Sequence, residues 1–125
     1  MKEQVISFET ANLAKKKGFD LEVQYTYADD EGNADFFDDW ENWNSYEDDY
    51  SAPTQSLLQK WIREKHEIDI FIEPFHIDKK SYYVLHGVYN SYETRNFPVG
   101  DRPTFDTYEQ ALEVALQEAL KLITT

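Results

Sequence analysis

The chain has 125 residues, 41% of them hydrophobic, which is enough for a single domain with one core and argues against wholesale disorder. It contains no cysteine, so disulfides, thiolate zinc sites and a cysteine nucleophile are excluded. The net charge of -13 disfavours direct nucleic-acid binding, because Lys and Arg are needed to displace counterions from phosphates.

The first third of the chain predicts a helix and a strand. Residues 8–17 have a modest apolar stripe, with Ser7 placed to cap the helix and Gly18 placed to end it. Residues 21–27 then alternate between apolar and polar side chains, with Leu21, Val23, Tyr25 and Tyr27 on one side, as in a half-buried strand.

The next segment is less regular. Residues 29–33 have the composition of a turn. Residues 34–50 fit neither the helix period nor the strand period, so we expect a loop or an irregular strand on the surface.

The second half predicts two further helices and a hairpin. Residues 51–66 form an amphipathic pattern with Ser51 as the candidate cap, and residues 67–77 and 81–89 form two strands joined by a short polar link. Residues 108–123 have a broad apolar face, and Thr107 with Gln110 has the spacing of a capping box.

Together these elements predict one α+β domain over residues 1–125. An antiparallel sheet with a central hairpin packs against about three helices, including a long C-terminal helix. We expect the core to include Trp61, Ile70, Leu112 and Leu116.

The negative charge is concentrated in one third of the chain. Between Gly18 and Gln59 there are 12 acidic residues and no Lys or Arg, whereas the other 13 acidic residues are balanced by all 12 basic ones. Within this region the acidic, aromatic-rich segment 28–50 has two interpretations. Its aromatic residues pack on the domain below a solvated acidic face, or they form with the acids a docking surface for a protein partner. The candidate partner-binding residues are Asp35, Asp38, Asp39, Trp40, Glu41, Trp43, Glu47, Asp48 and Asp49.

Other site chemistries have weaker support. A calcium loop starting at Asp29 would place Ala34 where the EF-hand pattern requires glycine, and the three histidines have no ligand spacing. The sequence has no nucleophile elbow, no phosphate-binding loop, no dinucleotide-binding fingerprint and no zinc protease motif. We therefore predict no metal site, no cofactor and no catalytic residue.

Three stretches carry a family resemblance: VISFETANLAKKKGFD (5–20), SAPTQSLLQKWIREKHEIDI (51–70) and FDTYEQALEVALQEALKLI (105–123). In them the chain resembles a family of small uncharacterised proteins from phages, prophages and mobile elements of gut anaerobic bacteria. The resemblance implies a cytoplasmic accessory protein of a mobile element, and it brings no active-site residue with it.

The function expected from the sequence is non-catalytic binding to another protein, with a basic protein as one candidate partner. One alternative is mimicry of a nucleic acid, in which carboxylates stand in for phosphates and occupy the groove of a DNA-binding host defence protein. Another is a small hydrolase with paired carboxylates in a pocket. No apolar run reaches the length of a signal peptide or a membrane span, so a cytoplasmic location without membrane contact is expected.

Overall fold

The computed structural model describes residues 3–28, 32–90 and 94–124. Within these ranges the chain forms three α-helices and two antiparallel sheets, so the predicted α+β class is confirmed. The helices are α1 (Phe8–Lys16), α2 (Gln55–His66) and α3 (Tyr108–Leu122). The strands are β1 (Val23–Tyr27), β2 (Asp35–Glu41), β3 (Tyr50–Ser51), β4 (Asp69–Ile77), β5 (Lys80–Tyr89), β6 (Thr94–Asn96) and β7 (Thr104–Phe105).

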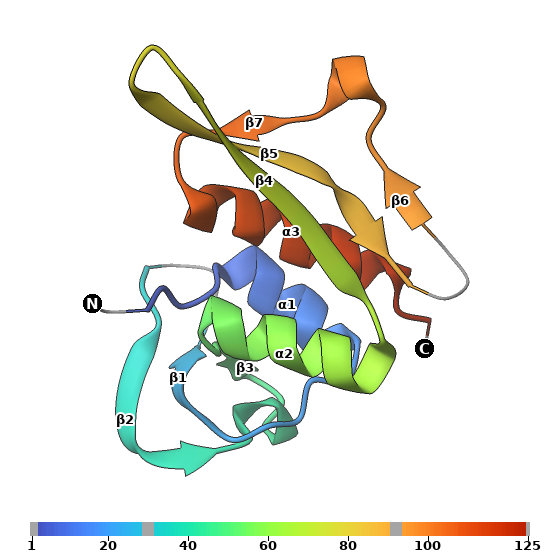
Figure 1. Cartoon of the computed structure of the whole chain (residues 1–125). Helices are drawn as coiled ribbons and strands as arrows, with labels where there is room; N and C mark the ends of the chain where they lie inside the picture. Colours follow the sequence, from blue (N-terminus) through green and yellow to red (C-terminus); the bar gives the residue numbers. More distant parts are fainter. Residues whose placement is uncertain (1–2, 29–31, 91–93, 125) are drawn as a thin grey trace.

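Helix α3 is the middle layer of the molecule. The sheet of β4, β5, β6 and β7 covers one side of α3, and α1 and α2 pack on the other side (Figure 1). Because α3 has neighbours on both sides, no residue from 111 to 120 is exposed, and its fully covered face consists of Ala111, Leu112, Ala115, Leu116, Ala119 and Leu120. The small sheet of β2, β1 and β3 lies beyond α1 and α2, at the opposite end of the molecule from the tip of the β4–β5 hairpin (Figure 1).

Helices α1 and α3 begin at the predicted caps. The Ser7 hydroxyl accepts a hydrogen bond from the Thr10 N–H at 3.3 Å. The Thr107 hydroxyl accepts from the Gln110 N–H at 3.1 Å, and the Gln110 side chain accepts from the Thr107 N–H at 3.3 Å. These bonds satisfy N–H groups that the first turn of a helix leaves without a partner, so the local signals in the sequence were sufficient here.

The predicted start of α2 was wrong. Ser51 belongs to β3, and the cap is Thr54, whose hydroxyl accepts from the Leu57 N–H at 3.3 Å. Pro53 explains the difference, because a proline disfavours helical geometry in the residue before it and so keeps Ala52 extended. The chain therefore leaves β3 in an extended conformation and enters the helix only after Pro53.

The predicted hairpin is confirmed as β4 and β5. The strands pair from Asp69 opposite Tyr89 to Ile77 opposite Lys80. Asp78 and Lys79 form the two-residue turn, with φ angles of 50° and 67°. Positive φ at both positions is typical of the tight turns whose twist matches that of the strands.

Strand β1 forms within residues 21–27, but the predicted alternation does not hold. The buried residues are Val23 and Thr26, whereas Tyr25 and Tyr27 are half-buried. The pairing with β2 shifts between Val23 and Tyr25, which rotates the second part of the strand relative to the first. The buried Thr26 hydroxyl is satisfied because it donates to the Tyr50 carbonyl at 3.1 Å.

One buried cluster unites the helices with both sheets. It includes the predicted core residues Trp61, Leu112 and Leu116, whereas Ile70 is only half-buried. Ile70 lies on β4, an edge strand, which explains its incomplete burial. Among the residues that the structure describes, no helix combines the length and the apolar character that crossing a membrane requires.

A polar network joins α1, α2 and α3 beside this core. One carboxylate oxygen of Glu113, Oε2, accepts from the Ser7 N–H at 3.0 Å, from the Ser7 hydroxyl at 2.9 Å and from the Thr10 hydroxyl. The other, Oε1, accepts from the Gln55 side-chain amide at 2.9 Å. Gln117 completes the network by donating to the Thr10 hydroxyl at 3.0 Å. The Glu113 carboxylate therefore lies at the positive end of α1, where negative charge is favourable.

Candidate functional site

Strand β2 has an unusual exposure for a strand of a folded protein. Every residue from Asp35 to Trp40 is exposed, and only Glu41 is half-buried. Three of the exposed side chains are large and apolar: Phe36 is 53% exposed, Phe37 43% and Trp40 58%. We call these seven residues, Asp35–Glu41, the β2 surface.

The prediction of a loop or irregular strand at 34–50 was only partly correct. The segment contains β2, a short 3-10 helix at Trp43–Ser45 and the start of β3. Both faces of β2 are exposed, so its apolar residues do not fall on one side of the strand. The alternation of apolar and polar residues that is typical of a half-buried strand is therefore missing from its sequence.

Strand β1 pairs with β2 only near the two ends of β2: Asp35, Phe36 and Glu41 have partner residues in β1, whereas residues 37–40 form a bulge without partners there. Tyr25 lies opposite Phe36, and their rings are 5.2 Å apart between centroids. The Gln24 side-chain amide donates to the Asp38 carbonyl at 3.2 Å, in the part of β2 where the regular register shifts. Trp40 makes no ring contact within the described ranges, so it is the apolar side chain of β2 that is most available to a partner.

Trp43 differs from the other candidate residues because it is buried. It is 9% exposed, and its indole N–H donates to the Val23 carbonyl at 2.8 Å. The Phe37 ring packs on it at 4.8 Å between centroids. The structure therefore places Trp43 beneath the β2 surface as a support, whereas Trp40 lies in solvent.

The acidic candidate residues occupy two places. Asp35, Asp38 and Asp39 are exposed on β2, and Glu41 ends the strand. Three others, Glu47, Asp48 and Asp49, lie in the turn before β3. Glu41 connects the two places, since its carboxylate accepts from the Tyr46 hydroxyl at 2.7 Å. The pKa of Tyr46 is raised, mainly by this hydrogen bond and secondly by the negative charge of Glu41.

Lys15 fixes the acidic turn to α1. Its ammonium group donates to the carbonyls of Tyr46 at 2.8 Å, Glu47 at 2.9 Å and Asp49 at 2.6 Å. It also lies 4.6 Å from the centroid of the Tyr50 ring. The positive charge of Lys15, on a neighbouring helix, thus compensates part of the negative charge of a region that has no Lys or Arg of its own.

We expect Lys15→Met to lower the free energy of unfolding by about 1 to 2 kcal/mol, because three charge-assisted hydrogen bonds are lost at a partly exposed site. Hydrogen exchange of residues 46–50 should become faster. The control is Lys16→Met, since Lys16 is exposed on the same helix. Equal effects of the two substitutions in denaturant unfolding would show that Lys15 does not hold the turn.

The three histidines occupy separate environments. His76 lies opposite Ser81 in the hairpin, and the Ser81 hydroxyl is 2.9 Å from His76 Nδ1. The His86 ring stacks on Phe71 at 4.2 Å between centroids, and its Nε2 is 2.9 Å from the Glu73 carboxylate. His66 packs against the Trp61 ring at the end of α2. The pKa of His66 is lowered, mainly by its burial and secondly by the positive charge of Lys65.

Metal binding has no further support in the described ranges. No group of three or more His, Asp or Glu side chains within residues 3–28, 32–90 and 94–124 is arranged to hold a metal ion. The start of the calcium loop considered from the sequence, Asp29, lies outside the described residues together with residues 30 and 31.

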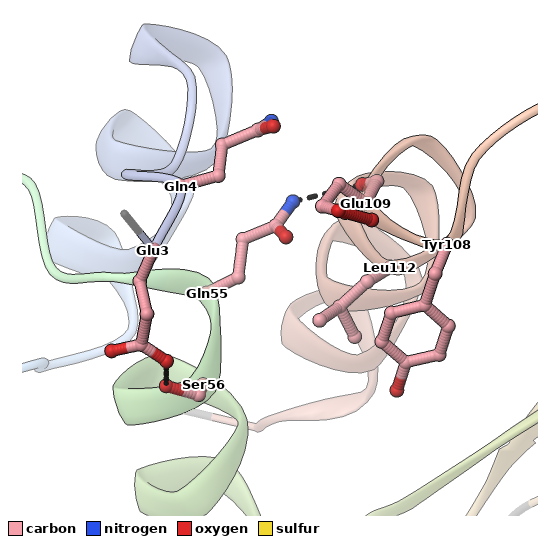
Figure 2. Close-up of a pocket in the computed structure, with 7 residues that line it drawn as sticks. All are labelled: Glu3, Gln4, Gln55, Ser56, Tyr108, Glu109 and Leu112. Atoms are coloured by element: carbon pink, nitrogen blue, oxygen red, sulfur yellow. Dashed lines mark hydrogen bonds between the residues drawn. The ribbon is translucent and has the colours of Figure 1, made fainter. Parts of the chain in front are cut away.

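A cavity of about 290 Å³ lies between the N-terminal segment, α2 and α3. Figure 2 shows the Glu3 carboxylate turned toward Ser56, whose hydroxyl donates to it at 2.6 Å, and away from Glu109. Between them, the Gln55 amide donates to the Glu109 carbonyl at 2.9 Å (Figure 2). Paired-carboxylate hydrolysis needs two carboxyl groups that face one reacting bond, and Glu3 and Glu109 do not point at a common position.

A second hollow of about 290 Å³ lies on the face of the four-stranded sheet that carries Phe75 and His86. Its polar groups are engaged by the protein itself. Glu73 and His86 pair with each other, and the Arg102 Nε donates to the Phe97 carbonyl at 3.1 Å. Compared with these two hollows, the β2 surface leaves more of its side chains open to a partner.

Comparisons with family models, with curated proteins and with solved structures each found no match. The resemblance to mobile-element proteins therefore stays a prediction, and the candidate site rests on the geometry of the chain itself.

Proposed function

We propose that the chain is a non-catalytic accessory protein that binds another protein through the β2 surface. The observation that carries this proposal is the exposure of Phe36, Phe37 and Trp40 on one strand. Large aromatic side chains contribute strongly at the centres of protein interfaces, where water is excluded. Three exposed aromatic side chains on one strand indicate a surface whose contact with a partner is favourable, because their apolar area is then removed from water.

The charge around these aromatics selects the partner. The β2 surface contributes Asp35, Asp38, Asp39 and Glu41, within the region from Gly18 to Gln59 that has no Lys or Arg. A negative field attracts a positively charged partner from a distance and accelerates its association, whereas it repels acidic proteins and phosphates. The partner that fits is therefore a basic protein surface with apolar side chains.

A purely structural explanation makes a different prediction. Charged residues on an exposed strand also prevent unwanted strand pairing and aggregation. On that explanation the acids protect the protein from contact, and Trp40 contributes nothing to any specific complex. The two explanations therefore differ in the effect of Trp40 on binding.

A peptide-display selection on the folded protein tests the proposal. We expect the selected peptides to be rich in Lys and Arg and to bind the wild-type protein. Trp40→Ala should accelerate their dissociation about 10-fold or more, as for an anchor residue at an interface centre. The control is Ile77→Ala, because Ile77 is 53% exposed at the far end of the β4–β5 hairpin.

Charge neutralisation separates the roles of the two residue types. Replacing Asp38 and Asp39 by Asn should slow association and weaken its dependence on salt, with little effect on dissociation. If charge neutralisation alone abolishes binding and Trp40→Ala changes nothing, the charges act by themselves, as in nucleic-acid mimicry. If neither substitution alters a rate constant in a correctly folded variant, the β2 surface is only a solvated face and the proposal fails.

A further inference from the structure

The cavity between the N-terminal segment, α2 and α3 has walls that the fold holds in place. The Gln55 N–H donates to the Gln4 carbonyl at 2.9 Å, and the Ile6 N–H donates to the Pro53 carbonyl at 3.1 Å, so the N-terminal segment is tied to the start of α2. On the other side, α3 begins at the capping box of Thr107. The volume of about 290 Å³ is at the lower end for small-molecule sites, and a preformed site loses less entropy when it binds.

Gln55 presents a hydrogen-bond acceptor in this cavity. Its side-chain nitrogen donates to the Glu109 carbonyl and to the Glu113 carboxylate, both at 2.9 Å. Because both partners are acceptors, they fix the orientation of the amide, and Figure 2 shows its oxygen directed away from Glu109, on the side of Leu112. No group within the described ranges donates to this oxygen, although Gln55 is only 4% exposed. A largely buried acceptor without a donor is costly, so a ligand that donates to it is favoured.

The charge of the lining selects a cation. Among the seven described residues that line the cavity, Glu3 and Glu109 are acidic and none is Lys, Arg or His. The first turns of α2 and α3 border the cavity, and such helix ends favour negative charge, which the two glutamates already supply. The Thr54 and Thr107 hydroxyls also accept from N–H groups of these turns. An anion would therefore be repelled by two carboxylates and would find part of the N–H groups engaged.

Tyr108 and Leu112 form the apolar part of the lining. Tyr108 is 40% exposed, and its ring packs edge-on against Tyr83 at 5.9 Å between centroids, which restricts its movement. An exposed aromatic face attracts an organic cation. Leu112 is nearly covered and contributes apolar surface to the same cavity. These side chains favour a ligand with methylene groups next to its charge.

We propose that this cavity binds a primary alkylammonium ion. The ammonium group donates a hydrogen bond to the Gln55 oxygen, Glu3 supplies opposite charge, and the Tyr108 ring contacts the neighbouring methylene groups. The site is independent of the proposed function, because the cavity shares no residue with the β2 surface. A free diamine and a lysine side chain both provide this chemistry, and two probes distinguish them.

The first test is a titration of the folded protein with 1,4-diaminobutane, followed by NMR. We expect saturable shifts at the residues that line the cavity, with a Kd of about 1 mM or tighter, which is within reach of a ligand with so few atoms. The matched probe is 1,4-butanediol, which has the same carbon chain and donates hydrogen bonds but has no charge. It should bind about 10-fold more weakly or less. Equal binding of the two probes, or shifts that spare the lining residues, overturns the proposal.

Two charge variants separate a specific site from the general attraction of amines to an acidic protein. Glu3→Gln removes one charge at the cavity and keeps an acceptor for the Ser56 hydroxyl. The control is Glu22→Gln, because Glu22 is exposed and does not line the cavity. We expect Glu3→Gln to weaken amine binding about 3-fold or more, and Glu22→Gln to change it by less than about 1.5-fold. Equal effects would show that the amine responds only to net charge, and the site would be rejected.

Further variants test the two proposed contacts. Gln55→Met keeps the length of the side chain without its oxygen and should lower the affinity about 10-fold. Tyr108→Leu should weaken binding about 3-fold or more, whereas Tyr108→Phe keeps the ring and should bind like the wild-type protein. Gln55→Met also loses the hydrogen bonds to Glu109 and Glu113, so its folding is checked by NMR. If it does not fold, the Tyr108 pair decides, and equal affinities of its two variants overturn the proposal.

A lysine probe identifies the source of the ammonium group. Nα-acetyl-lysine amide has the same ammonium group on a peptide unit. Tighter binding than 1,4-diaminobutane assigns the site to a lysine side chain of a protein, and weaker binding assigns it to a free amine. Trp40→Ala should leave both affinities unchanged, since Trp40 does not line the cavity. If neither amine binds, this proposal fails while docking at the β2 surface is unaffected.

Discussion

Leu116→Ala is expected to lower the free energy of unfolding by about 2 to 5 kcal/mol, toward the upper end of that range. Leu116 is fully buried in the middle of α3. Helix α3 lies between two layers, the four-stranded sheet and the pair α1 and α2 (Figure 1). The cavity left by the substitution cannot collapse easily, and incomplete collapse increases the cost. Denaturant unfolding measures the change.

Leu122→Ala is the matched control for this substitution. Leu122 is on the same helix and is half-buried at its end. The chemistry and the change in helix propensity are the same, so the difference between the two variants isolates burial. We expect Leu122→Ala to cost about half as much or less, since less apolar area leaves water when Leu122 packs. A smaller loss for Leu116→Ala than for Leu122→Ala would show that α3 is not the middle layer.

The helices could be predicted because their signals are local. Ser7, Thr107 and Gln110 are caps that act within one turn, and the apolar face of α3 repeats with the helical period. The hairpin is local in the same sense, since a two-residue turn at Asp78 and Lys79 sets its pairing. For α2 the proline rule was the missing signal: Pro53 could have shown that Ser51 precedes the helix.

The small sheet could not be predicted because its pairing is not local. The shift between Val23 and Tyr25 depends on β2, which lies in a separate part of the sequence, and it buries Thr26 against the alternation. The composition of the acidic segment correctly suggested a surface. It could not separate Trp40, which is exposed, from Trp43, whose indole is held by the Val23 carbonyl.

The hydrogen-bond network around Glu113 also could not be predicted from the sequence. Ser7 and Glu113 are 106 residues apart, and nothing in the apolar pattern of α3 distinguishes Glu113 from a solvent-facing glutamate. In the structure this carboxylate accepts four hydrogen bonds, from Ser7 twice, from Thr10 and from Gln55. Thr10 is fully buried and Gln55 is 4% exposed, so their polar groups depend on protein partners.

Glu113→Ala is therefore expected to lower the free energy of unfolding by about 2 to 4 kcal/mol. Hydrogen bonds to a charged group contribute more than neutral ones. The substitution removes the carboxylate that accepts from the Thr10 hydroxyl and one of the two acceptors of the Gln55 amide, whose other acceptor is the Glu109 carbonyl. The first turn of α1 also loses the negative charge at its N-terminus. Hydrogen exchange should accordingly accelerate in that turn, beyond what the global loss of stability explains.

Glu109→Ala is the control, because Glu109 is exposed one turn earlier on α3 and its side chain accepts no hydrogen bond in the network. We expect it to cost less than about 1 kcal/mol, as for an exposed acid near a helix start. A further readout is Tyr27. Burial and, next, the charge of Glu113 raise the pKa of Tyr27, so Glu113→Ala should lower this pKa toward its usual value without restoring it fully. A variant with unchanged stability and an unchanged Tyr27 titration would contradict the role of Glu113 as the link between α1, α2 and α3.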